Sequence, residues 1–141
     1  MKTALVTGAG NGIGAAIAQR LARDGYRIAV IDTDIENAKA RAQSLPEAVA
    51  YATDVTDERA VEAMLDALGD VPEVLVNNAG IVRFGPLLDH SVADFRKVID
   101  VNLVGTFIVS RAVGRRMIAR GSGAIVNITS INAVAPSPDA G

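Results

Sequence analysis

The sequence predicts an α/β fold built on a doubly wound parallel sheet of five strands. Short apolar runs, longer helical patterns between them, and a glycine-rich turn after the first run all indicate it. The runs are continuously apolar, which is typical of strands that are covered on both faces. Alternation of strand and helix favours parallel strands joined by crossover helices.

Each expected element follows from its local pattern. The expected strands are the β-branched apolar runs at 3–6, 27–31, 48–51, 74–76 and 124–128. The expected helices are the segments at 12–23, 34–43, 57–68 and 92–119. Capping boxes, in which two side chains satisfy free amides of a first turn, are expected at Thr33 with Glu36 and at Ser91 with Asp94. His90, just before the second box, is expected to be a surface residue without a functional role.

The composition suits one globular domain and excludes several classes of protein. Half of the 141 residues are hydrophobic, 21% are charged, and the formal net charge is −2. No basic block is present, so we expect no nucleic-acid partner. The absence of cysteine excludes disulfides, thiolate catalysis and zinc–thiolate sites, and a single histidine cannot build a metal site. No apolar stretch approaches the ~18 residues of a membrane span and no signal-peptide pattern opens the chain, so we expect no membrane contact and a cytoplasmic location.

The stretch VTGAGNGIGAAIA joins the first expected strand to the first expected helix and carries four glycines, at positions 8, 10, 12 and 14. Such a turn lets backbone amides approach a diphosphate, and the following helix presents its positive N-terminal end to that charge. Gly10, Gly12 and Ala15 also fit the G-x-G-x-x-G/A spacing of dinucleotide-binding turns. The alternative is a tight turn that binds nothing.

An aspartate follows at the distance that a dinucleotide site requires. Asp32 ends the second expected strand, roughly twenty residues beyond the central glycines. A carboxylate there can accept hydrogen bonds from both hydroxyls of the adenosine ribose, and it repels a 2′-phosphate. No Lys or Arg lies in the glycine turn or directly after Asp32. The sequence therefore predicts NAD as the cofactor in preference to NADP. The alternative for Asp32 is a solvated strand end or a helix cap.

Five motifs in order resemble those of the short-chain dehydrogenase/reductase family. They are TGAGNGIG at 7–14, DV at 54–55, NNAG at 77–80, VN at 101–102 and GAIVNITS at 123–130, and together they cover the whole chain. The resemblance implies a Rossmann fold and an NAD-binding domain over residues 1–141. It also implies an NAD(H)-dependent oxidoreductase that interconverts an alcohol and a ketone by hydride transfer. The cofactor-binding residues that it implies, with Asp32, are Gly8, Asn11, Gly12, Ile13, Gly14, Asp54, Val55, Asn78, Ala79 and Gly80.

Two further residues are expected to serve the chemistry. Asn102 follows Phe95, Val98 and Ile99 on the apolar face of the long helix, so its amide is expected to be buried and to have partners. The resemblance implies that Asn102 anchors a water of a proton relay, and the alternative is an Asn that only kinks the helix. Ser130 stands at the carboxyl end of the fifth strand, where open α/β sheets bind ligands. The resemblance implies that its hydroxyl holds the substrate oxygen, and the alternative is an ordinary Ser that begins a loop.

The proton-exchanging pair of the family, a Tyr-x-x-x-Lys sequence, is expected near position 143, beyond the last residue. The tyrosines present are Tyr26 and Tyr51, and neither has Lys four residues later. We therefore expect the chain to be the N-terminal part of the enzyme, with five strands present and the last strands missing. Residues 1–141 alone are expected to be inactive and to expose the fifth strand as an open edge.

Three functions from different classes stay open at this point. The first is the cofactor-binding part of an NAD-dependent oxidoreductase with a small-molecule alcohol or ketone substrate. The second is a non-catalytic NAD-binding module. The third is an S-adenosylmethionine-dependent methyltransferase, which also pairs a glycine-rich first turn with an acid after the second strand. For the intact protein, the resemblance implies a homo-dimer or homo-tetramer.

Overall fold

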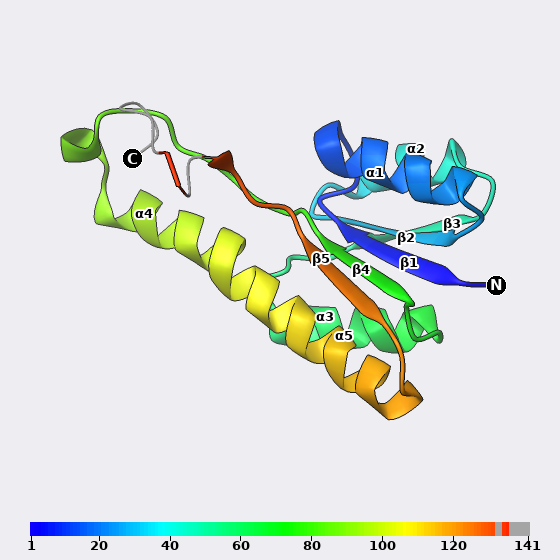
Figure 1. The fold of residues 1–141 in the computed structure, drawn as a ribbon. Coiled ribbons are helices and arrows are strands. Elements are labelled where there is room, and N and C mark those ends of the chain that lie inside the picture. Colours follow the sequence, from blue (N-terminus) through cyan, green and yellow to red (C-terminus); the bar gives the residue numbers. More distant parts are fainter. Residues whose placement is uncertain (132–133, 136–141) are drawn as a thin grey trace.

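The computed structural model describes residues 1–131 and 134–135, and in it five parallel strands form one sheet with helices on both faces (Figure 1). The strands are β1 (Thr3–Thr7), β2 (Arg27–Asp32), β3 (Ala48–Ala52), β4 (Val74–Asn77) and β5 (Ala124–Asn127). They lie in the order β3-β2-β1-β4-β5, and every neighbouring pair is parallel. The predicted doubly wound sheet is confirmed, with strand ends within one residue of expectation.

The first three helices begin within one residue of the predicted positions. They are α1 (Gly12–Arg23), α2 (Ile35–Gln43) and α3 (Glu58–Leu68). The capping box predicted at Thr33 and Glu36 is wrong, because Asp34 caps α2 and accepts hydrogen bonds from the amides of Glu36 and Asn37. Asp34 lies directly before the helix, so its short carboxylate reaches the free amides that Thr33 cannot.

The predicted helix at 92–119 is continuous in space but contains a π-helical turn. It consists of α4 (Val92–Ile99), η2 (Asp100–Gly105) and α5 (Thr106–Arg120). Ser91 caps α4 as predicted, since its hydroxyl accepts from the amide of Asp94 at 3.0 Å. The second half of the predicted box differs, because the carboxylate of Asp94 accepts from the Ser91 hydroxyl at 2.7 Å. The π turn brings Gly105 against Val55, where an added Cβ would lie 2.5 Å from Val55 Cγ2. One-turn π segments inside α-helices are frequent at functional sites.

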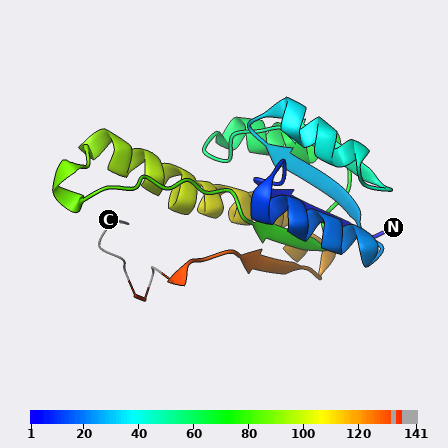
Figure 2. The ribbon, with the colours of Figure 1, turned by 90° about the horizontal axis from the view of Figure 1, so that it is seen from above.

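Two apolar cores hold the layers together, one on each face of the sheet. Side chains alternate along each strand, so Leu5 packs toward α3 and α5 while Val6 packs toward α1 and α2. Figure 1 shows α1 and α2 above the strands and α3 and α5 below them, and Figure 2 views the same layers from above. This two-sided burial explains the continuously apolar runs of β1 and β2, because both faces of those strands are covered.

The fifth strand does not follow that rule within the described residues. All four residues of β5 are exposed, and Ile125 and Val126 retain 41% and 46% of their accessible surface. The expectation that every strand is covered on both faces is wrong for β5, which lies at the edge of the sheet. The separate expectation that the fifth strand is exposed as an open edge agrees with the structure.

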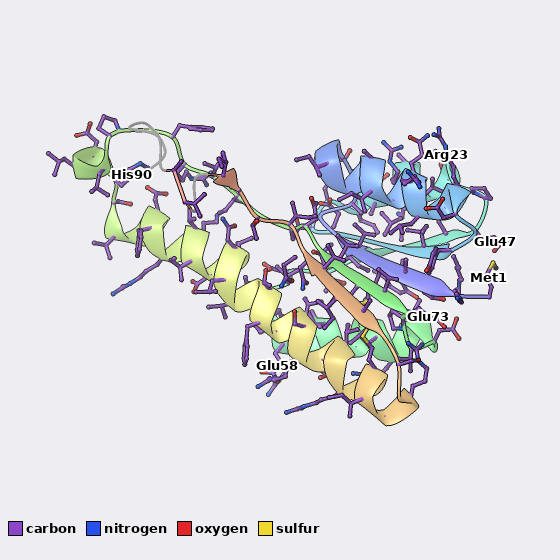
Figure 3. The ribbon with its side chains drawn as sticks, viewed as in Figure 1. Met1, Arg23, Glu47, Glu58, Glu73 and His90 are labelled. Carbon is purple, nitrogen blue, oxygen red and sulfur yellow. The ribbon has the colours of Figure 1, made fainter. Side chains whose placement is uncertain are left out.

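Ion pairs join α3 and α5 on one face of the sheet. Arg116 contacts Glu62 at 2.7 Å and Asp66 at 2.6 Å, and the hydrogen bond that its guanidinium donates to Glu62 is the main cause that raises the pKa of Arg116. Glu58, labelled in Figure 3, pairs with Arg111. These contacts hold the long helix against α3 and thereby place the π turn beside the carboxyl ends of the strands.

His90 lies where the long helix extends beyond the sheet (Figure 3). Its ring is partly buried, and Nε2 lies 3.1 Å from the carbonyl oxygen of Gly85. That contact closes the loop before α4. The residue is therefore less exposed than the sequence predicts, and its observed contact is structural.

Candidate cofactor-binding site

A cavity of about 620 Å³ lies at the carboxyl ends of the strands. Strand β1 lies between β2 and β4, and the chain crosses to its two neighbours over opposite faces of the sheet. Open α/β sheets bind ligands at such a switch point. The described residues that line the cavity are Gly8, Asn11, Ile13, Asp32, Thr33, Thr53, Asp54, Val55, Asn78, Ala79, Gly80, Ile81, Lys97 and Val101.

The glycine turn forms one wall of this cavity. Gly8 has a φ of +62° and Gly12 a φ of +54°, values that favour glycine. A Cβ on Gly14 would lie 2.2 Å from the carbonyl oxygen of Gly8, so only glycine lets the start of α1 approach the turn so closely. Gly12 and Gly14 do not line the cavity, but they shape the turn that presents Gly8 and Ile13 to it.

The first turn of α1 presents free amides at this wall. Asn11 is the N-cap of α1, and its side chain makes no capping hydrogen bond. The first amides of a helix have no acceptor within the helix. They therefore form a site for a negatively charged group such as a diphosphate.

Asp32 is held from two sides by backbone amides. Its Oδ2 accepts a hydrogen bond from the amide of Gly10 at 2.9 Å, and its Oδ1 accepts from the amide of Asp34 at 3.1 Å. Each carboxylate oxygen has a second lone pair that can accept another hydrogen bond. The carboxylate thus lies at the edge of the cavity in a fixed orientation, with acceptor capacity left for a ligand.

The segment after β3 forms the opposite wall. Asp54 accepts from the amide of Thr56 at 2.9 Å and from its hydroxyl at 2.7 Å, both through Oδ1. Within the part of the chain that the structure describes, Asp54 Oδ2 has no such partner. Val55 is buried beneath the cavity and packs against Gly105. This wall combines an apolar surface with one available carboxylate oxygen.

Hydrogen bonds join the segment after β4 to the glycine turn. The hydroxyl of Thr7 accepts from the amides of Asn78 and Ala79, both at 3.0 Å. The side-chain amide of Asn78 donates to the carbonyls of Thr7 at 3.0 Å and Gly8 at 3.1 Å. Two segments about seventy residues apart in the sequence are thereby fixed as one surface, which carries Gly80 at the cavity.

The comparison with known protein families decides which class of nucleotide-binding domain this is. The family model described as short chain dehydrogenase matches residues 2–141. The chain belongs to this family. The motifs at 7–14, 54–55, 77–80 and 101–102 therefore belong to a short-chain dehydrogenase, and the methyltransferase alternative is wrong.

Similar curated short-chain dehydrogenases include enzymes named for sugar alcohols. The D-threitol dehydrogenase of Mycolicibacterium smegmatis is 44% identical over 137 residues, which are 92% of this chain and 52% of that protein. The galactitol 2-dehydrogenase (L-tagatose-forming) of Cereibacter sphaeroides is 44% identical over 134 residues, again 92% of this chain and 52% of that protein. The chain thus spans about half the length of the curated relatives it matches.

Solved structures of other dehydrogenases share the fold. NAD⁺-bound xylitol dehydrogenase superposes with a TM-score of 0.94 at 39% identity, over 99% of this chain and 56% of that one. The 3-oxoacyl-[acyl-carrier protein] reductase of Brucella melitensis with bound NAD superposes with a TM-score of 0.93 at 33% identity, over 99% of this chain and 57% of that one. These structures confirm the Rossmann fold predicted from the sequence.

The structure does not bring the two expected catalytic side chains of the dehydrogenase into the cavity. Asn102 has the expected partners, since its amide bonds both backbone groups of Ile81, but its side chain is exposed instead of buried. The reason is that no described element covers the outer side of the long helix, where Phe95 and Ile99 are exposed as well. Ser130 lies three residues beyond β5, at the predicted edge of the sheet, and it is exposed. The roles of both residues stay predictions.

Sequence reasoning missed five residues of the cavity as ligand contacts, namely Thr33, Thr53, Ile81, Lys97 and Val101. Lys97 lies one helical turn before Val101 and on the same face of the helix, so the VN motif could have indicated that Lys97 also faces the site. Among the described residues no group of acidic, His or Cys side chains could hold a metal ion. In the same part of the chain, no helix has the length and apolar character needed to cross a bilayer.

Proposed function

We propose that the protein to which this chain belongs is an NAD(H)-dependent oxidoreductase that interconverts an alcohol and a ketone by hydride transfer. One observation carries the proposal: the cavity is lined both by the glycine turn at the start of α1 and by the carboxylate of Asp32. Its volume of about 620 Å³ lies within the usual range of ligand sites, which is roughly 300–1,000 Å³.

The residues fit an adenine dinucleotide. The free amides at the start of α1, at Gly12 and Ile13, would hold the diphosphate. Asp32 would accept both hydroxyls of the adenosine ribose, and its negative charge disfavours a ribose that carries a 2′-phosphate. Asp54 and Val55 would border the adenine ring. When bound, NAD supplies the acceptor for the hydride.

The segment Asn78–Ala79–Gly80 would carry the nicotinamide half. The hydrogen bonds to Thr7 and Gly8 support this placement, because they fix the segment beside the diphosphate site. Asn102 fixes the following residue, Ile81, through its side-chain amide. We assign to Asn102 a role in anchoring a water of the proton relay.

Ser130 would hold the oxygen of the substrate, and the proposal assigns the proton exchange to a Tyr–Lys pair outside residues 1–141. Tyr51 is no substitute for that tyrosine. Its side chain packs against the core, and burial raises its pKa, which opposes loss of the phenolic proton near neutral pH. On this basis the 141 residues alone bind the cofactor without turning over substrate.

The substrate class proposed is a small polyol and its ketose. It rests on relatives named for threitol, galactitol and sorbitol. A cytoplasmic location and a homo-oligomer of the intact protein belong to the same proposal. Four exposed apolar side chains at four-residue spacing along the long helix support self-association: Phe95, Ile99, Leu103 and Phe107.

The test is titration of the purified protein with NADH, NADPH and S-adenosylmethionine, followed by an assay of the intact protein with NAD and a panel of polyols. We expect NADH to bind more tightly than NADPH, S-adenosylmethionine not to bind, and a polyol to be oxidised. No binding of NADH by folded protein would overturn the proposal. Binding of NADH without oxidation of any alcohol would favour the non-catalytic NAD-binding module.

A further inference from the structure

The backbone conformation of Gly10 does not require glycine. Gly8 and Gly12 have positive φ angles, whereas the φ of Gly10 lies outside the left-handed range. Another residue could therefore adopt the backbone conformation of position 10 without strain. The atoms around the Cα of Gly10 explain why a side chain is absent at this position.

Those surroundings consist of the adenosine-binding carboxylate and the first turn of α2. A Cβ on Gly10 would lie 2.8 Å from Asp32 Oδ2, 3.1 Å from Asp32 Cγ and 2.9 Å from Asn37 Cβ. Contacts below 3.0 Å force a neighbour to move. Position 10 therefore lacks a side chain because the carboxylate of Asp32 occupies the space.

Asn37 cannot easily give way. Its backbone amide donates to Asp34 Oδ1 at 3.1 Å, and its side-chain amide donates to Asp34 Oδ2 at 2.8 Å. Displacement of Asn37 would break the cap of α2. The Asp32 carboxylate, the end of a side chain held by hydrogen bonds from two backbone amides, is the neighbour that would move.

The same glycine also directs the carboxylate. Its amide donates to Asp32 Oδ2 at 2.9 Å, while the amide of Asp34 donates to Oδ1 at 3.1 Å. One donor therefore comes from the glycine turn and the other from the start of α2. A methyl group on Gly10 would rotate the carboxylate away from the first donor and change the orientation offered to a ribose.

We infer that Gly10 is a positioning residue that sets the preference for an unphosphorylated adenosine ribose, by leaving room for Asp32 and by donating to its carboxylate. The inference rests on the proposed function, because it concerns the adenosine end of the same cavity. Gly10 acts through Asp32 and makes no contribution of its own to the choice between NAD and NADP.

The test is a double-mutant cycle that combines Gly10→Ala with Asp32→Ala. The dissociation constants of NADH and NADPH are measured for the original protein, both single variants and the double variant, and the quantity compared is their ratio. We expect Gly10→Ala to lower the preference for NADH about tenfold, as for loss of a hydrogen bond to a charged group. In the Asp32→Ala background, Gly10→Ala is expected to change the ratio less than twofold.

Gly114→Ala is the matched control, because the new methyl group would meet only Ile125 Cδ1 at 4.0 Å. It is expected to leave the ratio unchanged. If Gly10→Ala does not fold, the single variant Asn37→Gly is compared with the double variant Gly10→Ala/Asn37→Gly. The change at Asn37 removes its Cβ, which is one of the two groups that the new methyl group would meet. Thermal unfolding establishes that each variant is folded.

The outcomes separate the inference from the proposed function. If the original protein is folded and does not bind NADH, the proposed function fails. If it prefers NADH and Gly10→Ala keeps that preference, the inference fails and the function stands. An equal effect of Gly10→Ala with and without Asp32 also overturns the inference, because the glycine would then act independently.

Discussion

The side chain of Asn102 pairs with both backbone groups of Ile81: Oδ1 accepts from the amide at 2.8 Å, and Nδ2 donates to the carbonyl at 2.9 Å. The pair joins the π turn of the long helix to the segment after β4. Ile81 lines the cavity, whereas Asn102 does not. Asn102 therefore acts on the site through the backbone that it holds.

Replacement of Asn102 by Ala is expected to loosen this segment. Both hydrogen bonds are lost, and each contributes about 1 kcal/mol. We expect the amide of Ile81 to exchange with solvent at least roughly fivefold faster, which hydrogen-exchange measurements by NMR can detect. Leu103→Ala, a change at an exposed neighbour, is the control and should leave that amide unaffected. Unchanged protection of Ile81 in Asn102→Ala would contradict the role assigned to the pair.

Gly14→Ala is expected to destabilise the protein and to abolish binding of NADH. The added Cβ would lie 2.2 Å from the carbonyl oxygen of Gly8 and 2.4 Å from Asn78 Nδ2, so the start of α1 must move away from the turn. Overpacking of this kind costs about 1–3 kcal/mol. Urea denaturation and NADH titration measure the two effects, with Gly114→Ala as the control. Wild-type affinity in the variant would show that the close approach is unnecessary.

Lys97→Glu is expected to weaken binding of NADH. Lys97 lines the cavity with two carboxylates, Asp32 and Asp54, and an anionic diphosphate ligand gains from its positive charge. We expect a roughly two- to tenfold rise in the dissociation constant at low salt and a smaller one at high salt, because salt screens exposed charges. Lys2→Glu makes the same charge change at the amino end of β1 and is the control. Equal effects of the two substitutions would mean that only net charge matters.

Ser91→Ala is expected to raise the pKa of Asp94 toward its ordinary value. The Ser91 hydroxyl donates to Asp94 Oδ2 at 2.7 Å, and this hydrogen bond, with the charge of Arg83, lowers the pKa of Asp94. A lowered pKa in the folded state means that the ionised carboxylate favours folding. Its contribution is present above the unfolded value, about 3.9, and is lost as the pH falls through the folded value.

The loss of stability in Ser91→Ala should therefore be larger at neutral pH than in acid. The missing helix cap alone costs about 1 kcal/mol. Urea denaturation at both pH values and NMR titration of Asp94 measure the effects. Ser44→Ala removes a hydroxyl that donates to the carbonyl of Arg41, and no carboxylate is involved, so its effect should not depend on acid pH. A pKa of Asp94 that does not move would contradict the assignment.

Phe107→Glu tests the proposed homo-oligomer of the intact protein and is expected to disrupt it. Phe107 is 59% exposed and belongs to the apolar row along the long helix, so a carboxylate there would be buried against a second copy. Light scattering after size-exclusion chromatography should report a smaller species. Leu88→Glu, a change at another exposed apolar side chain outside this row, is the control. An unchanged mass would place the contact elsewhere.

The order of strands and helices, the glycine turn and the place of Asp32 were all predicted from the sequence alone. Each depends on a local pattern: continuous apolar runs, helical periodicity, and the distance from Gly12 to Asp32 along one strand–helix–strand unit. Nine of the eleven predicted cofactor residues line the cavity. They lie at or near the carboxyl ends of strands, which a local pattern can locate.

Only the tertiary structure decided which residues meet across long distances in the sequence. The contact of Gly10 with Asp32 and Asn37, the bonds of Asn78 to Thr7 and Gly8, and the place of Lys97 at the cavity depend on how separate segments pack. The exposure of Asn102 has the same origin. A local pattern records that a residue is apolar or that a turn is tight, but burial depends on whether another segment covers it.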